Sequence, residues 1–392
     1  MTQHSRINDI QPFHVMALLT RAKELESQGK DIIHMEVGEP DFPTPQPIID
    51  AAIAGVSQGQ VRYTPASGLP ELRQAIADFY KSRYSSSLSA ERIVVTPGAS
   101  GALMLALGAI IEEGEEVILA DPGYPCNRNF VRFLSGQSRA ISVDASSGYQ
   151  LTLKHVEQNW RSNTRAVIVA TPSNPTGTLL DKKEIVAIAN FVKQHDAYLI
   201  VDEIYHGLVY DIDVDTALNY KQAGIDENII VINSFSKYFN MTGWRLGWLV
   251  APESLISDID KLAQNIFLSA ATPSQYAALA AFSPETLLIL EKNKKELKQR
   301  RDFLLPKLRE LGFKIEVEPQ GAFYIYASCE KFSRDSYQFA YEILEKVGVA
   351  ITPGKDFGEN KANTFVRFAY TTSIARLEEA IQRLENYLKT LG

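Results

Sequence analysis

Seven short runs rich in Val, Ile, Leu and Ala recur in the middle of the chain, and helical stretches lie between most of them. The runs cover residues 93–96, 117–121, 140–143, 166–170, 198–202, 229–233 and 247–250. Several are continuously apolar rather than alternating, which is typical of strands that helices cover on both faces of a sheet. Strands that alternate with helices indicate a mostly parallel sheet, so the pattern predicts an α/β layered domain.

The last third of the chain follows a different pattern. It predicts a long charged helix at 285–311, extended segments at 313–317 and 323–327, a helix near 337–347, a strand at 364–370 and a final helix from Ile374. Such mixed patterning indicates a second, smaller α+β domain. A helix at 13–26 is too polar for the core of the sheet and is expected to pack onto this domain. We therefore assign residues 38–275 to a large domain, and residues 1–37 and 276–392 to a small one.

The composition argues against several classes of protein. The formal net charge of −7 disfavours a protein that mainly binds nucleic acid or anionic lipid. The longest strongly apolar stretch, 102–111, is too short to span a bilayer, and residues 1–13 have no apolar core of the signal-peptide type. The two cysteines, Cys126 and Cys329, form no CxxC pair and have no histidine cluster, so neither a metal site nor a disulfide framework is expected. The sequence thus predicts a soluble, cytoplasmic protein.

Lys237 lies just past the end of the apolar run 229–233. Ligands of open α/β sheets collect outside the carboxyl ends of the strands, although most lysines are solvated surface groups. Ser234 and Ser236 lie beside Lys237, and Arg245 follows eight positions later. All three side chains could donate hydrogen bonds to a phosphate. A phosphate beside a lysine suggests a phosphorylated aldehyde that the lysine holds as an imine.

Asp202 ends another apolar run, and Tyr205 lies just inside the loop that follows. A carboxylate in that place needs a cationic partner or strong hydrogen bonds. Pyridoxal 5'-phosphate (PLP) would supply such a partner, because a carboxylate keeps its pyridine nitrogen protonated and the protonated ring acts as an electron sink. Alternatively, Asp202 caps the next helix, and on this residue alone the two interpretations are about equally good. The presence of Lys237 further along the chain favours the cofactor.

Three further residues have positions that suggest ligand binding. Asn174, in a loop dense in proline and glycine, could donate its amide to an anionic ring oxygen, or the loop is a generic turn. Tyr124 follows a predicted strand and could stack on a flat ring, although a tyrosine on a surface turn explains it about as well. Arg367 lies inside the last predicted strand, where an arginine needs a partner, and a carboxylate suits it.

Small residues precede the predicted helix at 102–111. Backbone N–H groups of Ala99, Ser100 and Gly101 could bind a phosphate there, because helix N-termini are natural anion sites. The segment is neither a Walker loop nor a dinucleotide fingerprint, so it is a weak signal by itself.

Taken in order along the chain, these motifs resemble those of the class I/II (fold type I) PLP-dependent aminotransferases, in particular the aspartate/alanine aminotransferase-like subgroup. The segment around Lys237, Ser-Phe-Ser-Lys-Tyr-Phe-Asn-Met-Thr-Gly-Trp-Arg, is similar to the family's lysine-attachment signature. The resemblance extends from Val37 to Arg367. It implies a large domain with a mostly parallel seven-stranded sheet flanked by helices, and a smaller α+β domain.

The resemblance also implies a role for each matching residue. The implied roles at the ring are Schiff-base formation and proton transfer by Lys237, pairing with the pyridinium by Asp202, bonding of the ring oxygen by Tyr205 and Asn174, and stacking by Tyr124. The implied phosphate ligands are Ser234, Ser236, Arg245, Ala99, Ser100 and Gly101, and the implied substrate ligands are Arg367, Gly38 and Asn174. Tyr63 is similar to a tyrosine that is donated across a homodimer interface to the partner's phosphate.

One position departs from the pattern of aspartate-specific members. Some of them carry a lysine in the phosphate loop that binds the distal carboxylate of the substrate, whereas this chain has Ser100 there. Arg128 or Arg132 could replace that lysine, or both are solvated charges on a helix surface. Asn127 is a candidate hydrogen-bond partner of Asp202.

The expected activity is ping-pong transfer of an amino group between an L-amino acid and a 2-oxo acid, with Lys237 as cofactor anchor and proton carrier. Two alternatives stay open at this point: a PLP-dependent lyase on the same fold, and a non-catalytic binding module that kept the fold. The intact set of Lys237, Asp202 and Arg367 argues against the binding module. Alanine, aspartate, glutamate, branched-chain and aromatic amino acids all remain open as donors.

Overall fold

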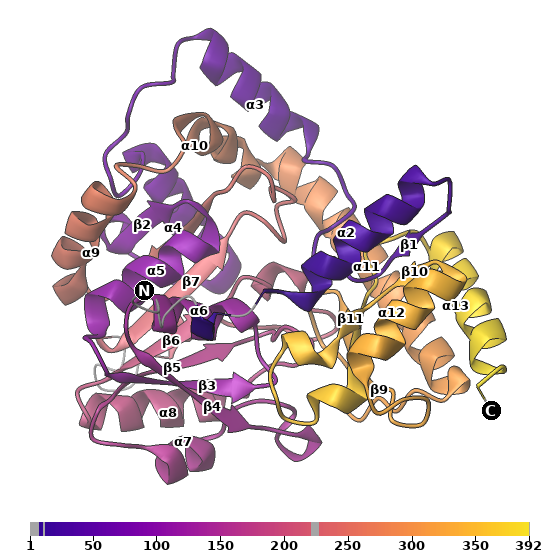
Figure 1. Ribbon diagram of the computed structural model, residues 1–392. Coiled ribbons are helices and arrows are strands. Elements are labelled where there is room, and N and C mark those ends of the chain that lie inside the picture. The colour runs from indigo at the N-terminus through magenta and orange to yellow at the C-terminus, as the bar shows by residue number, and fades with distance from the viewer. Residues whose placement is uncertain (1–7, 11, 221–226, 392) are drawn as a thin grey trace, which may run out of the picture.

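A seven-stranded sheet forms the centre of the larger part of the molecule (Figure 1). The computed structural model describes residues 8–10, 12–220 and 227–391. The strands are β2 (Ile93–Thr96), β3 (Glu116–Asp121), β4 (Gln137–Ser142), β5 (Thr164–Ala170), β6 (Tyr198–Asp202), β7 (Ile229–Ser234) and β8 (Gly247–Val250), in the order β2-β8-β7-β6-β5-β3-β4. Neighbours run parallel except at β8, which is antiparallel to β2 and β7. Each predicted run overlaps one strand, so the predicted α/β fold is confirmed.

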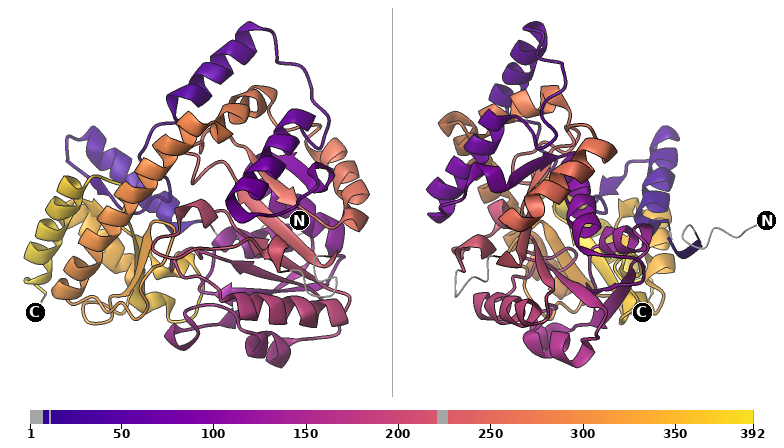
Figure 2. Two further views of the ribbon diagram at one scale, coloured as in Figure 1. Left: turned by 180° about the vertical axis from the view of Figure 1, so that it is seen from behind. Right: turned by 90° about the vertical axis from the view of Figure 1, so that its left-hand side faces the viewer.

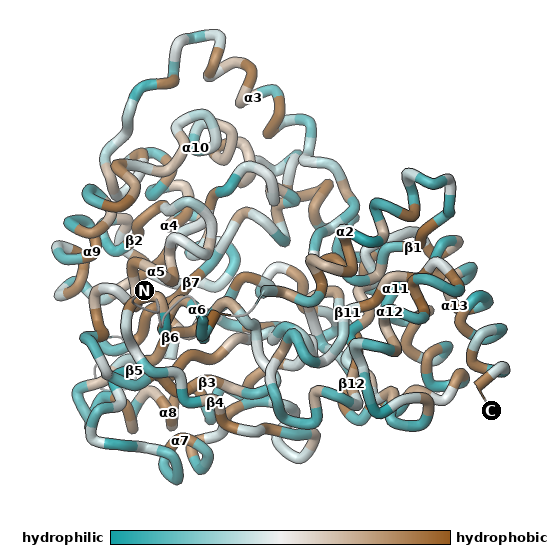
Figure 3. Tube along the Cα trace, in the orientation of Figure 1, coloured by the Kyte–Doolittle hydropathy of each residue, from teal (hydrophilic) through white to brown (hydrophobic). Residues whose placement is uncertain are grey.

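Helices bury both faces of this sheet, which explains why several of its strands are continuously apolar. In β7, Ile230 and Ile232 belong to one apolar core while Ile229 and Val231 belong to the other, because successive side chains of a strand point to opposite faces. The first core is completed by α5 (Gly98–Ile110), α6 (Pro125–Phe133) and α9 (Glu253–Ile266), and the second by α4 (Pro70–Tyr84), α7 (Leu153–Asn159) and α8 (Lys182–Gln194). In Figure 3 the strands are mostly brown and the outer loops mostly teal.

The C-terminal third forms a smaller α+β part. The strands β9 (Tyr324–Ser328), β11 (Thr352–Pro353) and β12 (Phe365–Ala369) make an antiparallel sheet in the order β11-β12-β9. Helix α12 (Ser336–Val347) packs on this sheet, and α13 (Ile374–Leu388) packs on α12. The N-terminal segment lies with this part, since β1 (Ile33–His34) pairs with β10 (Val349–Ala350) and α2 (His14–Ser27) packs on α12. The domain limits at residues 38 and 276 stay a prediction.

The expected extended segment 313–317 is not a strand. Lys314 forms a single bridge with Ser328 of β9, and the pairing then ends. The chain instead leads towards Gly177, whose carbonyl accepts a hydrogen bond from the N–H of Gly321 at 2.9 Å.

Two helices determine the outline of the molecule. Helix α11 (Pro284–Leu311) runs from the part that holds the large sheet to the C-terminal part, where it packs on α13 (Figure 2). Helix α3 (Gln46–Ser57) packs on α10 (Thr272–Leu279) and stands out from the body of the protein (Figures 1 and 2). Within the described residues, no helix combines the length and apolar character needed to cross a membrane.

Candidate active site

Most of the residues that the sequence singled out line one cavity of about 300 Å³. They are Gly38, Ala99, Ser100, Tyr124, Asn174, Asp202, Tyr205, Ser234, Ser236, Lys237, Arg245 and Arg367. Gly101 and Tyr63 do not line this cavity.

The topology of the sheet explains why these residues meet. Strands β5, β6 and β7 are parallel neighbours, so the segments at their carboxyl ends, which hold Asn174, Asp202 and Lys237, open at one edge. Strand β8 runs in the opposite direction, so Arg245 just before it lies at the same edge. Strand β2 is antiparallel to β8, so α5, which follows β2, also begins there.

The side chain of Lys237 reaches into the cavity, where Nζ donates a hydrogen bond to the carbonyl oxygen of Gly38 (2.6 Å). Loss of solvation lowers the pKa of Lys237 to about 8, and the charges of Arg367 and Arg245 act in the same direction. Glu39 and Asp202 oppose this change. Lys237 therefore loses its proton more readily than an exposed lysine does, as a nucleophile or base requires.

Asp202 is buried at the end of β6. One of its oxygens accepts a hydrogen bond from the N–H of Ile204 at 3.0 Å. Burial raises the pKa of Asp202 to about 6, although this hydrogen bond and the charge of Lys237 lower it in part. One hydrogen bond and one nearby charge do not offset the loss of hydration of this carboxylate. It therefore suits a cationic partner such as a protonated ring nitrogen.

Tyr205 and Tyr324 form a pair at the wall of the cavity, with their hydroxyl oxygens 2.8 Å apart. Burial raises the pKa of Tyr205 well above its usual value, so this phenol stays protonated and can donate. The backbone of Gly38 approaches the same place, because an added Cβ would lie 2.3 Å from the hydroxyl oxygen of Tyr324. Only glycine fits at residue 38 without a displacement of the tyrosine.

Hydroxyl and guanidinium donors gather at the start of α5. The Oγ atoms of Ser234 and Ser236 lie 3.0 Å apart, and both residues are buried. The guanidinium of Arg245 lies against Gly98, where an added Cβ would be 2.8 Å from Nη2. Such a combination of hydroxyl groups and an arginine suits a phosphate.

Helix α5 begins at Gly98 rather than at the predicted residue 102. The N–H groups of Ala99 and Ser100 therefore belong to its first turn, where they have no acceptor within the helix. These N–H groups add the positive end of the helix dipole to the hydrogen-bond donors of Ser234, Ser236 and Arg245, which favours an anion such as a phosphate. Gly101 lies in the same turn but faces the residues that precede the helix.

Arg367, on β12, is 5% exposed and is held by three acceptors. Its Nη1 donates to Oδ1 of Asn174 (2.9 Å), and Nη2 donates to the carbonyl of Glu36 (2.5 Å) and to Oγ1 of Thr352 (3.1 Å). Its Nε is buried without a hydrogen-bond partner. The guanidinium also lies over the ring of Tyr324, 4.2 Å from its centre. Three of the five N–H groups of Arg367 are thus used, and one on Nη1 and that of Nε are left over. An arginine fixed in this way suits a carboxylate ligand.

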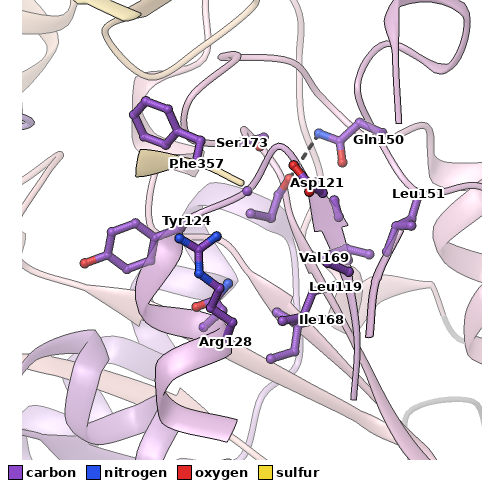
Figure 4. A pocket seen from close by; sticks show the side chains of 15 residues that line it. Leu119, Asp121, Tyr124, Arg128, Gln150, Leu151, Ile168, Val169, Ser173 and Phe357 are labelled. Atoms are coloured by element: carbon purple, nitrogen blue, oxygen red, sulfur yellow. Dashed lines mark hydrogen bonds between the residues drawn. The ribbon is translucent and has the colours of Figure 1, made fainter. Parts of the chain in front are cut away.

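A smaller pocket of about 40 Å³ lies beside the cavity and shares Tyr124 with it (Figure 4). Arg128 lines this smaller pocket and donates to the carbonyl of Asp356 at 3.2 Å. Arg132 pairs with Asp9 at 2.7 Å. Neither arginine lines the large cavity, so the structure does not place either of them at a bound substrate.

Asn127 is not a hydrogen-bond partner of Asp202 in this structure. It lines the smaller pocket, and its Oδ1 is buried without a partner. Tyr63 is 84% exposed, so its side chain is accessible to another molecule. Its donation to a partner's phosphate stays a prediction.

The sequence did not single out the apolar residues of the cavity, or Tyr324. These apolar residues are Phe13, Val15, Met16, Leu19, Val37, Leu103 and Ile204. A helix at 13–26 was predicted, but its amphipathic pattern does not tell which side faces a cavity and which side faces neighbouring helices.

Comparison with known proteins agrees with this geometry. Residues 30–384 match the family described as aminotransferase class I and II. A (5-formylfuran-3-yl)methyl phosphate transaminase from Methanocaldococcus jannaschii is 38% identical over 386 residues, and the match covers 98% of each chain. A valine–pyruvate aminotransferase from Mycobacterium tuberculosis is 37% identical over 379 residues, 97% of each chain. The crystal structure of an aspartate aminotransferase from Thermotoga maritima matches with a TM-score of 0.91 at 34% identity, over 98% of this chain and 99% of that one. These matches disfavour the lyase and the non-catalytic module, and the chain belongs to the class I and II aminotransferases.

Proposed function

We propose that the protein moves an amino group between an L-amino acid and a 2-oxo acid with PLP attached to Lys237, in a ping-pong reaction. One observation carries this proposal. The amine of Lys237 reaches into the same cavity as the donors at the start of α5, the buried Asp202 and the buried Arg367. One cavity thus offers an anchor for an aldehyde, a cradle for its phosphate and a cation for a substrate carboxylate.

The residues of the cavity fit PLP group by group. Asp202 would support a protonated ring nitrogen, because the hydrogen bond from Ile204 and the charge of Lys237 offset the burial of its carboxylate only in part. The Oδ1 of Asn174 accepts from Arg367, so its amide N–H groups remain to donate to the ring oxygen together with Tyr205. Tyr124 lines the same cavity, and its ring would stack on that of the cofactor. The residues that would hold the phosphate are Ala99, Ser100, Ser234, Ser236 and Arg245.

Different residues of the chain would bind the substrate and transfer its proton. When bound, PLP supplies an electron sink for the negative charge left on the substrate α-carbon. Arg367 binds the substrate α-carboxylate and so fixes the α-carbon in the cavity. Nζ of Lys237 takes the proton from that carbon, and its hydrogen bond to the carbonyl of Gly38 orients the amine.

We further propose that the protein works as a cytoplasmic homodimer in which Tyr63 of one subunit completes the phosphate site of the other. Tyr63 does not line the cavity of its own chain and is 84% exposed. Ile53, Val56 and Val61, close to it along the chain, are 60%, 52% and 56% exposed. Apolar side chains exposed in this number on one projecting segment support a subunit interface.

Removal of the amine of Lys237 tests the proposed function. Lys237→Ala is expected to abolish both turnover and the visible absorbance of lysine-bound PLP. Lys294→Ala is the matched control, because Lys294 is also a partly buried lysine with a lowered pKa but lies outside the cavity. Retention of turnover and absorbance by Lys237→Ala would refute the assignment.

A half-reaction separates transamination from elimination. With an amino donor alone, the wild-type enzyme should convert its cofactor stoichiometrically to the amino form and then stop. A lyase would keep releasing product without accumulating that form.

Hybrid dimers test the role of Tyr63. Neither Lys237→Ala nor Tyr63→Ala homodimers should be fully active. If Tyr63 acts across the interface, mixing the two variants creates one complete site per hybrid and restores activity. Absence of any restoration, with hybrids shown to form, would place Tyr63 outside the partner's site.

A further inference from the structure

We propose that α2 and its neighbours form an apolar wall that selects substrates with an uncharged, apolar side chain, for the amino donor and for the 2-oxo acceptor alike. This inference rests on the proposed function and assigns the substrate class to that site. It follows from the lining of the cavity, the way α2 is fixed, and the charges that remain available to a second carboxylate.

The wall is made by side chains far apart in the sequence. Val15, Met16 and Leu19 come from the first turns of α2, Phe13 directly precedes this helix, Val37 follows β1, and Leu103 comes from α5. Leu19 follows Met16 by three positions and Val15 by four, so it lies on the same side of the helix as both. That side forms the part of the cavity wall that offers no hydrogen bonds from side chains.

Asp356 fixes the start of α2 over the cavity. This buried carboxylate accepts hydrogen bonds from the N–H groups of His14 (2.7 Å) and Val15 (2.8 Å). These are N–H groups of the first turn, which lack acceptors within a helix. The wall therefore belongs to the folded site and is not a loose terminal segment.

Each of the three cationic residues that line the cavity in the described part of the chain already has a proposed role. Lys237 is the anchor, and Arg245 lies on Gly98 in the phosphate cradle. Arg367 is held by Asn174 beside the place of the α-carboxylate. Among the described lining residues there is no further lysine, arginine or histidine. A second carboxylate on the substrate would thus be desolvated against apolar side chains without a partner from this chain, which is unfavourable.

Glu36 also lines the cavity but brings no cation to it. Its side chain is fully buried, with Oε1 2.7 Å from Nδ1 of His34, and its carbonyl accepts a hydrogen bond from Arg367. Glu36 therefore offers no partner for a second carboxylate.

The same site must accept both substrates, because the two half-reactions of a ping-pong enzyme use one cavity in turn. The acceptor is therefore expected to lack a distal carboxylate as well. Pyruvate or an apolar 2-oxo acid meets this requirement, whereas 2-oxoglutarate and oxaloacetate do not.

The test is a set of half-reactions with the PLP-loaded enzyme, followed through the cofactor absorbance. Leucine, valine and methionine should react with a kcat/KM at least about 100-fold above that of aspartate or glutamate. The amino form of the enzyme should likewise prefer pyruvate to 2-oxoglutarate. A kcat/KM for a dicarboxylate equal to or above that of the apolar substrates would overturn the inference and point to a cation from Arg128 or from a partner subunit. Failure of every donor would instead refute the proposed function.

A charge placed in the wall gives an independent readout. Met16 is 53% exposed, so Met16→Arg is expected to fold and to present a cation to the cavity. It should lower the preference for leucine over aspartate by about ten-fold or more. Ala17→Arg is the matched control, because the neighbouring Ala17 is exposed and does not line the cavity. An equal preference for leucine over aspartate in the two variants would show that the wall does not contact the substrate side chain.

Ligands that do not react provide a check without turnover. 4-Methylpentanoate should compete with donors more strongly than succinate in the wild-type enzyme. The inhibition constants of the two ligands should become more similar in Met16→Arg. Tighter binding of succinate than of 4-methylpentanoate by the wild type would contradict the proposal.

Discussion

Replacement of Asp202 by Asn should stabilise the cofactor-free protein while it removes most of the activity. Asn keeps the size of the side chain, and its Oδ1 can still accept the N–H of Ile204, which now lies 3.0 Å from the carboxylate. It removes only the buried negative charge. Burial of that charge has a cost in the free protein, and the cost is expected to be recovered when a cationic ring nitrogen pairs with it.

The pKa values give the size of the effect. Burial raises the pKa of Asp202 from 3.8 to about 6. Because the folded-state pKa lies above the unfolded one, the stability contributed by the protonated acid is complete below pH 3.8 and is lost as the pH rises through 6. The difference, 6 − 3.8 = 2.2, corresponds to about 3 kcal/mol as an upper bound. Asp202→Asn should therefore gain up to about 3 kcal/mol at pH 8 and much less at pH 4.5.

Urea unfolding of cofactor-free protein at these two pH values measures the gain. Asp258→Asn, which changes an exposed carboxylate on α9, is the control and should move the stability by at most a few tenths of a kcal/mol. PLP should raise the melting temperature of the wild type more than that of Asp202→Asn. A variant that is no more stable at pH 8, or equally more stable at both pH values, would show that Asp202 carries no burial cost.

Three other changes test Arg367 in the cavity, the packing behind the start of α5, and the buried acid that follows Asp202. Arg367→Lys should raise KM for amino acids and lower kcat/KM by about 10- to 100-fold, because a lysine cannot reproduce the fork of hydrogen bonds, while simple amines without a carboxylate should react unchanged. Gly247→Ala should weaken PLP binding measurably in equilibrium titration, since its Cβ would lie 2.7 Å from the backbone of Gly98 and displace the start of α5. Burial raises the pKa of Glu203 from 4.5 to about 8, so the stability that its protonated form contributes is lost as the pH rises through 8. The melting temperature of Glu203→Gln should therefore fall less than that of the wild type between pH 6 and pH 9.

The large sheet and its edge could be predicted because both have local signals. Strands buried on two faces must be apolar at every position, and this makes short continuous runs that stand out from the helices. Parallel strands bring their carboxyl ends to one edge, so residues such as Lys237, Asp202 and Asn174 could be expected to meet without knowledge of their contacts.

The wall and the surroundings of Arg367 could not be predicted in this way. Arg367 donates to the carbonyl of Glu36, 331 residues away, and this contact depends on how β12 is placed beside the segment after β1. The orientation of Tyr324 towards Tyr205 likewise depends on packing between the two parts of the molecule. Arg128 was an open candidate because an arginine on a helix gives no local sign of whether it faces a pocket, a carbonyl or solvent.

This division between the sheet edge and the wall has a consequence for substrate specificity. The proposed cofactor ligands lie mostly at the edge of the large sheet, whereas α2, the segment after β1 and β12 supply the proposed apolar wall and Arg367. A substitution in α2 can therefore change the substrate class while the proposed cofactor site stays intact. Relatives that match nearly the whole chain carry the names of a furan phosphate transaminase, a valine–pyruvate aminotransferase and an aspartate aminotransferase. Such diversity of names at similar identity is expected if specificity depends on a few wall residues, as we propose for residues 13, 15, 16, 19 and 37.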